Sequence, residues 1–128
     1  MKVLVDTHAL VWWAIDKPSL SSRSRALFAD DNNEILVSAV VAWELATKAR
    51  SGKWPEALAL ATHIASVIDD NSLTPLSITV EHARVAGLFI WQHRDPFDRM
   101  LAAQAQIEGI PLVSADPVFR SFGTPVIW

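Results

Sequence analysis

The chain has 128 residues, of which 51% are hydrophobic and 20% charged, and it carries a formal net charge of −3 without any cysteine. This length fits one compact domain over residues 1–128, and the balance of apolar and charged residues excludes intrinsic disorder. The absence of cysteine excludes disulfides and thiolate metal sites and fits a reducing compartment.

Short apolar runs alternate with helix-forming segments along the first half of the chain. In order, we expect a strand at 2–5, a helix at 8–15, a helix at 21–29, a strand at 34–38 and a helix at 39–50. Ser21 is placed to cap the second of these helices, and Gly52 lies just beyond the end of the third.

The same alternation continues through the second half. In order, we expect a helix at 55–68, a weak strand at 76–78, a helix at 80–91, a helix from Pro96 that Gly109 closes, a strand at 111–114, a helical turn at 117–120 and an edge strand at 126–128. The pattern predicts an α/β fold, with a central, mostly parallel sheet of about five strands and helices on both faces.

Four acidic residues occupy similar places in this pattern. Each lies where a predicted strand gives way to a helix, or in the first turns of a helix: Asp6, Glu44, Asp98 and Asp116. Because ligands of an open α/β sheet bind outside the carboxyl ends of the strands, we expect these carboxylates to converge. Carboxylate oxygens without a cage of histidines fit Mg²⁺ or Mn²⁺ and not Zn²⁺. The pattern therefore predicts metal-dependent phosphodiester hydrolysis.

Each acid taken alone has a simpler interpretation. Asp6 is compatible with a plain strand end, and the i, i+4 spacing of Glu44 and Lys48 is typical of a surface ion pair. Asp98 suits the positive end of a helix dipole, and Asp116 is a common turn opener. The histidines lack a metal-ligand spacing, so surface or helix-end roles are expected for them. The metal-site hypothesis depends on the four acids occurring together.

The net charge of −3 is unfavourable for a nucleic-acid enzyme at first sight. Removing the four proposed site acids from the total of 14 leaves 10 acids against 11 Lys and Arg, so the rest of the chain is close to neutral. We expect bound metal and a few local cations to provide the attraction for phosphate, with weak non-specific affinity as the result.

Four motifs surround these acids in order: VDTHAL at 5–10, SAVVAWE at 38–44, DPFDRMLAAQA at 95–105 and LVSAD at 112–116. With these motifs the whole chain resembles PIN-domain ribonucleases, specifically the VapC-type toxins of bacterial and archaeal toxin–antitoxin modules. The resemblance implies a PIN-like three-layer fold and an endoribonuclease that depends on Mg²⁺ or Mn²⁺. It also implies that the metal-binding and catalytic quartet is Asp6, Glu44, Asp98 and Asp116.

The resemblance adds secondary site residues beside the quartet, namely Asp95, Thr7, Ser38, Ser114 and Arg99. Asp95 is expected mainly to cap a helix, with an outer-shell role as the alternative. The three hydroxyl residues would bond a carboxylate, a water or a phosphate oxygen. Arg99 would contact phosphate or lie on the helix surface.

Partners follow from the same resemblance. VapC-type toxins are held inactive by a small antitoxin whose tail packs into a hydrophobic groove, and they commonly form homodimers, so we expect an RNA substrate, a cognate antitoxin and a second copy of the chain. Adjacent Trp12 and Trp13 cannot both face inward on one helix, and one of them is expected to meet solvent or a partner.

Neither a membrane span nor a secretory signal is expected. The longest uninterrupted apolar stretch, residues 9–15, is far shorter than the roughly 20 residues that cross a bilayer. A charged residue interrupts the amino-terminal apolar run too early for a signal peptide, so we expect a cytoplasmic protein.

Three other interpretations remain to be distinguished. A PIN-like module could bind RNA or a partner without cleavage, although the complete quartet argues against loss of activity. A receiver-like regulatory domain needs adjacent acids near the end of the first strand and an aspartate after the third, which this chain lacks. A haloacid-dehalogenase-type phosphatase needs Asp-x-Asp, but His8 stands two residues after Asp6.

Overall fold

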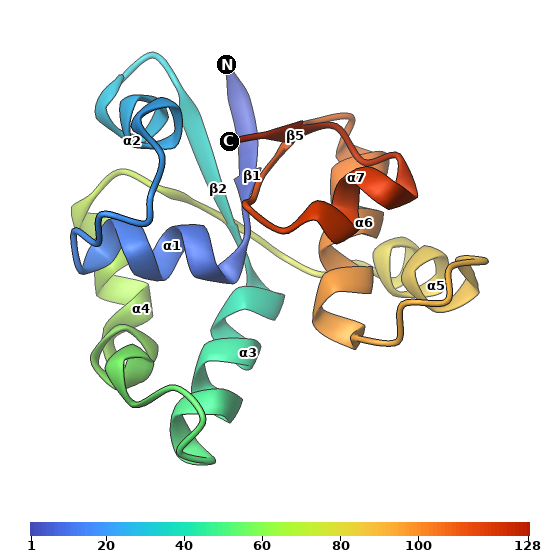
Figure 1. The fold of residues 1–128 in the computed structure, drawn as a ribbon, viewed down its shortest axis with the longest axis horizontal. Coiled ribbons are helices and arrows are strands. Elements are labelled where there is room, and N and C mark those ends of the chain that lie inside the picture. The colour runs from blue at the N-terminus through green and yellow to red at the C-terminus, as the bar shows by residue number, and fades with distance from the viewer.

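Five parallel strands form the centre of the computed structural model, which describes residues 1–128 (Figure 1). The strands are β1 (Lys2–Val5), β2 (Glu34–Ser38), β3 (Thr74–Leu76), β4 (Leu112–Val113) and β5 (Val126–Ile127). They are arranged in the order β3-β2-β1-β4-β5, and every neighbouring pair is parallel. The parallel α/β sheet predicted from the sequence is therefore confirmed.

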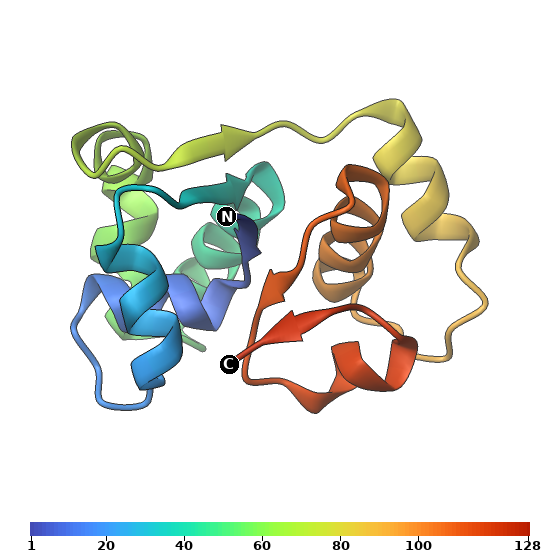
Figure 2. The same cartoon turned by 90° about the horizontal axis from the view of Figure 1, so that it is seen from above.

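Helices cover both faces of this sheet. They are α1 (Thr7–Ala14), α2 (Ser22–Ala29), α3 (Ala39–Arg50), the 3-10 turn η1 (Pro55–Ala57), α4 (Leu58–Asp70), α5 (Val80–Leu88), α6 (Pro96–Glu108) and α7 (Pro117–Phe122). Figure 2 shows α1, α2 and α4 on one side of the sheet and α5, α6 and α7 on the other, which gives the expected three layers. None of the helices is long and apolar enough to cross a membrane.

The central strand is the most deeply buried element of the sheet. Val3, Leu4 and Val5 of β1 are all 0% exposed, as expected for a parallel strand that helices cover on both faces. The core extends through Leu101 of α6 and Phe119 of α7, which are both buried. Because a close-packed core resists displacement, the residue that follows β1 has a fixed position.

The strand order reverses beside β1. From β1 the chain moves outward through β2 to β3 and later returns on the other side of β1 through β4 to β5. Ligands of open parallel sheets bind at such a reversal, outside the carboxyl ends of the strands. Asp6 directly follows β1, and Asp116 lies three residues beyond β4, so the topology brings these two acids to the same crevice.

Some boundaries differ from those predicted. The third strand is Thr74–Leu76 instead of 76–78, because Leu76 pairs with Ser38 at the end of β2 and the ladder extends back from there. Its central residue, Pro75, lies on an edge strand, where a missing amide donor is tolerated. The helix expected at 55–68 consists of η1 followed by α4, whose helical geometry is interrupted at His63.

The helix expected at 80–91 ends at Leu88. Phe89 leaves the helical region with φ −51° and ψ 127°. The guanidinium of Arg99 on α6 donates hydrogen bonds to the carbonyl oxygens of Ala86, Phe89 and Trp91, at 2.9, 2.8 and 2.7 Å. A side chain from another helix thus satisfies carbonyls at the end of α5, a contact that local sequence does not indicate.

Two glycines are expected to respond oppositely to the same substitution. Gly109 ends α6 with φ 65°, a left-handed conformation, so Gly109→Ala should lower the free energy of unfolding by roughly 1–2 kcal/mol. A β-carbon at Gly87 within α5 would meet no atom within 4 Å, so Gly87→Ala should raise it by about 0.5–1 kcal/mol. Urea unfolding measures both shifts, and shifts of the same sign would contradict these backbone conformations.

Candidate metal centre

Three aspartates of the candidate site also cap helices. Asp6 Oδ1 accepts the amide N–H of Ala9 at 2.7 Å at the start of α1, and Asp116 Oδ1 accepts that of Val118 at 2.9 Å at the start of α7. Asp95 caps α6, as predicted, through the amide of Phe97 at 2.9 Å. The amino ends of helices carry partial positive charge, so each cap both orients a carboxylate and stabilises its negative form.

Glu44 lies in α3, where two side chains hold its carboxylate. Thr7 Oγ1 donates to Oε1 at 2.5 Å, and the ammonium of Lys48 donates to Oε2 at 2.5 Å. The i, i+4 ion pair suggested by the sequence is present, but it is not a surface pair, because Glu44 is only 4% exposed. Burial of a carboxylate requires such compensation, which explains why both of its oxygens are engaged.

The four candidate acids line one small pocket of about 100 Å³. Its lining is Asp6, Thr7, His8, Glu44, Lys48, Asp95, Asp98, Asp116 and Phe119. A larger hollow of about 560 Å³ between the end of α6 and β5 has no titratable side chain in its lining. Asp6 and Asp116 are 110 positions apart in the sequence, yet they line the same pocket, as the parallel strand topology predicted.

Crowding and burial change the titration of two of these acids. Burial raises the pKa of Asp6 from 3.8 to about 7, with smaller contributions from the charges of Asp98 and Glu44, against hydrogen bonds from Ser114 and Ala9 that lower it. Burial also raises the pKa of Asp98 to about 6, although its hydrogen bond with His93 lowers it. Carboxylates of this kind favour a cation that replaces the lost solvation.

Two of the three predicted hydroxyl residues contact site acids. Thr7 bonds Glu44, and Ser114 bonds Asp6 and also accepts the amide N–H of Asp116 at 3.0 Å. Ser38 instead caps α3 by accepting the amide N–H of Val40 at 3.1 Å, and it does not line the pocket. The structure therefore gives Ser38 a local role, whereas Thr7 and Ser114 orient carboxylates.

Arg99 has a different role from the expected phosphate contact or free helix surface. Its guanidinium donates to carbonyl oxygens of the segment 86–93, and it does not line the acidic pocket. Those donors are occupied because the segment after α5 has no regular structure in which to pair its own carbonyls. Arg99 is therefore a structural residue that fixes this segment against α6.

Two histidines lie near the acids, although their spacing in the sequence did not indicate it. His93 Nε2 lies 2.7 Å from Asp98 Oδ2, and His8 lines the acidic pocket with its ring 4.5 Å from that of Trp54. Burial lowers the pKa of His8. Both histidines were expected at the surface or at helix ends, because the spacing of the histidines in the sequence shows no metal-ligand pattern. Their positions in the fold place them close to the acids of the pocket.

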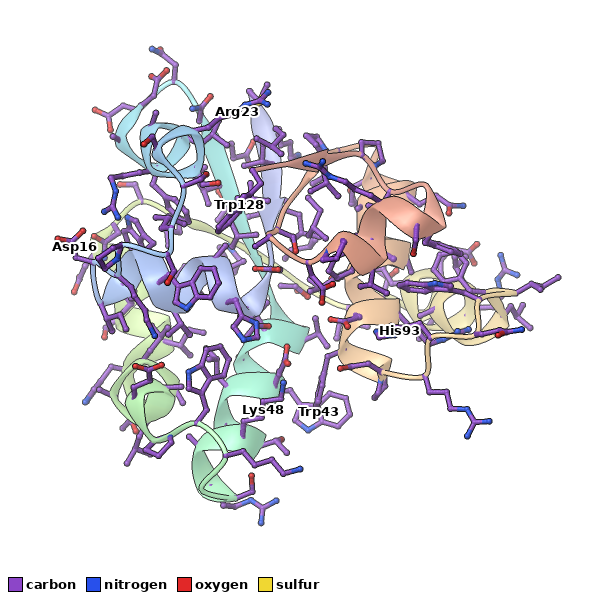
Figure 3. All side chains as sticks on the ribbon, viewed as in Figure 1. Asp16, Arg23, Trp43, Lys48, His93 and Trp128 are labelled. Atoms are coloured by element: carbon purple, nitrogen blue, oxygen red, sulfur yellow. The ribbon has the colours of Figure 1, made fainter.

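Figure 3 shows the region where α3 approaches the first turn of α6. The side chains labelled there include Trp43 and Lys48 on α3 and His93, which precedes α6. Trp43 is 59% exposed, and its ring contacts that of Phe97 edge-on, with the ring centroids 4.9 Å apart. Lys48 is the only lysine or arginine in the lining of the acidic pocket. An excess of oxygen donors over positive charge fits a hard divalent cation such as Mg²⁺ or Mn²⁺.

The family follows from a comparison of the sequence with models of known families. The model of the PIN domain matches residues 3–124. The chain belongs to the PIN domain family. No curated protein matches the chain significantly.

Solved structures share this PIN fold over almost the whole chain. VapC20 of Mycobacterium tuberculosis, a sarcin–ricin loop cleaving toxin, has a TM-score of 0.69 at 17% identity, with 95% of each chain covered. VapBC2 from Rickettsia felis, bound to a DNA fragment from its promoter, has a TM-score of 0.65 at 17% identity, covering 99% of this chain and 98% of the other. FitAcB from Neisseria gonorrhoeae has a TM-score of 0.65 at 17% identity, covering 98% and 96%. The PIN-like fold predicted from the motifs is confirmed.

The raised pKa values of the site predict a pH dependence of stability without metal. Folded Asp6 and Asp98 keep their protons up to about pH 7 and about pH 6, whereas the unfolded chain releases them near 3.8. Their contribution to the free energy of unfolding is therefore full below pH 3.8 and is lost as pH rises through the two folded pKa values.

Asp6→Asn isolates this contribution. In EDTA, the variant should gain stability relative to the original protein between about pH 5 and about pH 8, because asparagine never acquires the buried charge. Thermal unfolding at both pH values measures the difference. Asp69→Asn, at an exposed aspartate on α4, should show no such change. A pH-independent difference for Asp6→Asn would contradict the raised pKa of Asp6.

Proposed function

We propose that this PIN domain, residues 1–128, is an endoribonuclease toxin of the VapC type that hydrolyses RNA phosphodiester bonds with Mg²⁺ or Mn²⁺. The observation that carries the proposal is the pocket in which Asp6, Glu44, Asp98 and Asp116 lie together. Carboxylates that share a pocket repel one another, and at a separation of 4 Å each pair would cost roughly 1 kcal/mol even in water. A protein that maintains such a cluster at a ligand-binding edge needs a cation there.

The four acids are the proposed ligands of the ion. The chemistry that a divalent ion supplies when bound is activation of water and stabilisation of charge on the phosphoryl oxygens. The chain itself provides orientation: Ala9 holds Asp6, Thr7 holds Glu44, and Ser114 lies between Asp6 and the backbone of Asp116. Ligands fixed by such contacts need little rearrangement when the ion and the substrate enter.

Lys48 provides positive charge for the substrate. Its ammonium group forms an ion pair with Glu44 Oε2, and its side chain is 30% exposed. An RNA backbone that approaches the pocket therefore meets one fixed cation in addition to bound metal, which fits the near-neutral charge of the remaining protein. We propose RNA as the substrate, in accordance with the sarcin–ricin loop cleavage described for VapC20.

The proposed protein partners are an antitoxin and a second copy of the chain. Trp43 and its neighbours Val40, Ile78, Pro96 and Met100 line an apolar groove on α3 and α6, and Trp43 directly precedes Glu44. Trp12 and Trp13 are both half-buried, so neither faces the core completely; Trp12 packs against Trp128, and Trp13 packs against Phe28. An antitoxin tail in the Trp43 groove would lie beside the acidic pocket. A cytoplasmic location belongs to the same proposal.

Cleavage of RNA tests the catalytic part. The purified chain should cut a structured RNA with Mg²⁺ or Mn²⁺ and lose this activity in EDTA. Asp6→Asn should lower the rate by at least about 100-fold, because removal of a ligand costs at least as much as removal of its supporting contacts. Asp69→Asn should cut normally. Equal cleavage by Asp6→Asn and the original protein would mean a contaminating nuclease or a different site.

Absence of cleavage with intact RNA binding would favour a module that only binds RNA. Gel-shift measurements on the same samples distinguish this outcome from a failure to bind RNA at all.

Metal affinity distinguishes Asp98 from Asp95. Asparagine still caps a helix well, so Asp95→Asn keeps the structure of the α6 start while it removes the charge. Asp98→Asn should weaken Mn²⁺ binding by about 10- to 100-fold, whereas Asp95→Asn should weaken it by less than about 10-fold. Isothermal titration calorimetry measures both constants. Equal losses would make Asp95 a ligand of the same importance.

A further inference from the structure

His93 is the one histidine whose ring nitrogen bonds an acid of the quartet. Its Nε2 lies 2.7 Å from Asp98 Oδ2, and one ligand atom each of His93, Asp95 and Asp98 lie within 4.8 Å of one another. The side chains of His93 and Asp98 are 30% and 18% exposed, so solvent ions can reach them. The family motifs around the quartet do not include His93, because it lies two residues before the third motif begins.

The position of His93 is maintained by the helix that carries Asp98. Arg99, the next residue on α6, donates to the carbonyl oxygen of His93 at 3.1 Å and to that of Trp91 at 2.7 Å. The Trp91 ring packs against the imidazole with centroids 4.9 Å apart. One turn of α6 therefore presents the carboxylate and also fixes the backbone of the residue that meets it. This arrangement is more constrained than a chance contact of a loop histidine.

We propose that His93 is a nitrogen ligand of the ion bound at Asp98 and makes the site prefer Mn²⁺ over Mg²⁺. The inference rests on the metal-binding part of the proposed function. Two ligand atoms about 2.1 Å from one ion and at right angles are about 3 Å apart, which is close to the 2.7 Å between Nε2 and Oδ2. Imidazole nitrogen is a good ligand for transition ions, whereas Mg²⁺ binds oxygen and keeps its waters.

The competing role for His93 is that of a hydrogen-bond donor that only orients Asp98. The two roles predict different effects of a side chain that keeps an N–H donor but lacks a ligand nitrogen. An orienting donor would affect Mn²⁺ and Mg²⁺ alike, because both ions use the same carboxylate. A ligand would affect Mn²⁺ selectively, because nitrogen coordination contributes to that ion and not to Mg²⁺.

Calorimetric titration with Mn²⁺ and with Mg²⁺ separates these roles. His93→Gln should weaken Mn²⁺ binding by about 10-fold or more and change Mg²⁺ binding by less than about 3-fold. His63→Gln, at an exposed histidine of α4, is the matched control and should leave both affinities unchanged. Equal losses for the two ions in His93→Gln would overturn the proposal. His93→Asn, a shorter amide, should give the same selective loss and guards against a folding defect in one variant.

Pulsed electron paramagnetic resonance gives a direct test. Mn²⁺ bound to the original protein should show a coupling to an imidazole ¹⁴N nucleus, which should disappear in His93→Gln and persist in His63→Gln. His8 also lines the pocket, so His8→Gln is the decisive comparison. Loss of the coupling in His8→Gln, with its retention in His93→Gln, would assign the nitrogen to His8 and overturn the proposal.

Failure of this inference differs from failure of the proposed function. If neither ion binds to the original protein, the metal-dependent nuclease and the role of His93 are both overturned. If Mn²⁺ and Mg²⁺ bind with similar affinity, and no nitrogen coupling is seen, only the role of His93 is overturned. Neither measurement requires RNA, so the result does not depend on finding the right substrate.

Discussion

The gathering of several carboxylates in one small, partly buried pocket is the constraint on which the rest of the structure depends. Each charge loses solvation there and repels the others, and the structure offsets this cost in three ways. Asp6, Asp95 and Asp116 accept backbone N–H groups at the amino ends of helices. Thr7 and Lys48 donate hydrogen bonds to the two oxygens of Glu44, and the pKa values of Asp6 and Asp98 are raised. These compensations allow the carboxylates to lie in one pocket of the folded protein.

Each capping carboxylate both begins a helix and lines the acidic pocket. A carboxylate that begins a helix has its position set by the first turn, and that turn is set by the strand or loop before it. Asp6 directly follows Val3, Leu4 and Val5 of β1, which are 0% exposed, so the core fixes its position. Asp116 is placed by Ser114 and by the short helix α7. The positions of these two carboxylates are therefore set by the same strands and helices that form the fold.

The side of the site formed by α6 depends on a long-range contact. Arg99 donates hydrogen bonds to the irregular segment between α5 and α6. His93 and Asp95 belong to the last part of this segment, which lies beside Asp98. The donors of Arg99 satisfy carbonyls that would otherwise be left without partners, so the segment can remain irregular and still be ordered. Arg99 also lines the apolar groove at Trp43, which lies between α3 and α6. The acidic pocket and the apolar groove both have part of their lining on α3 and α6.

The sequence by itself determined the alternation of strands and helices, the parallel sheet and the convergence of Asp6, Glu44, Asp98 and Asp116. Hydrophobic runs and helix caps are local signals, and the carboxyl ends of parallel strands meet at one edge of the sheet. The tertiary structure alone decided what surrounds the acids. The burial of Glu44 against Thr7, the early end of α5 at Leu88, the role of Arg99 and the approach of His93 all depend on contacts that the local sequence does not indicate. Such contacts leave no periodicity in the sequence, since a side chain's partner is chosen by packing and not by spacing along the chain.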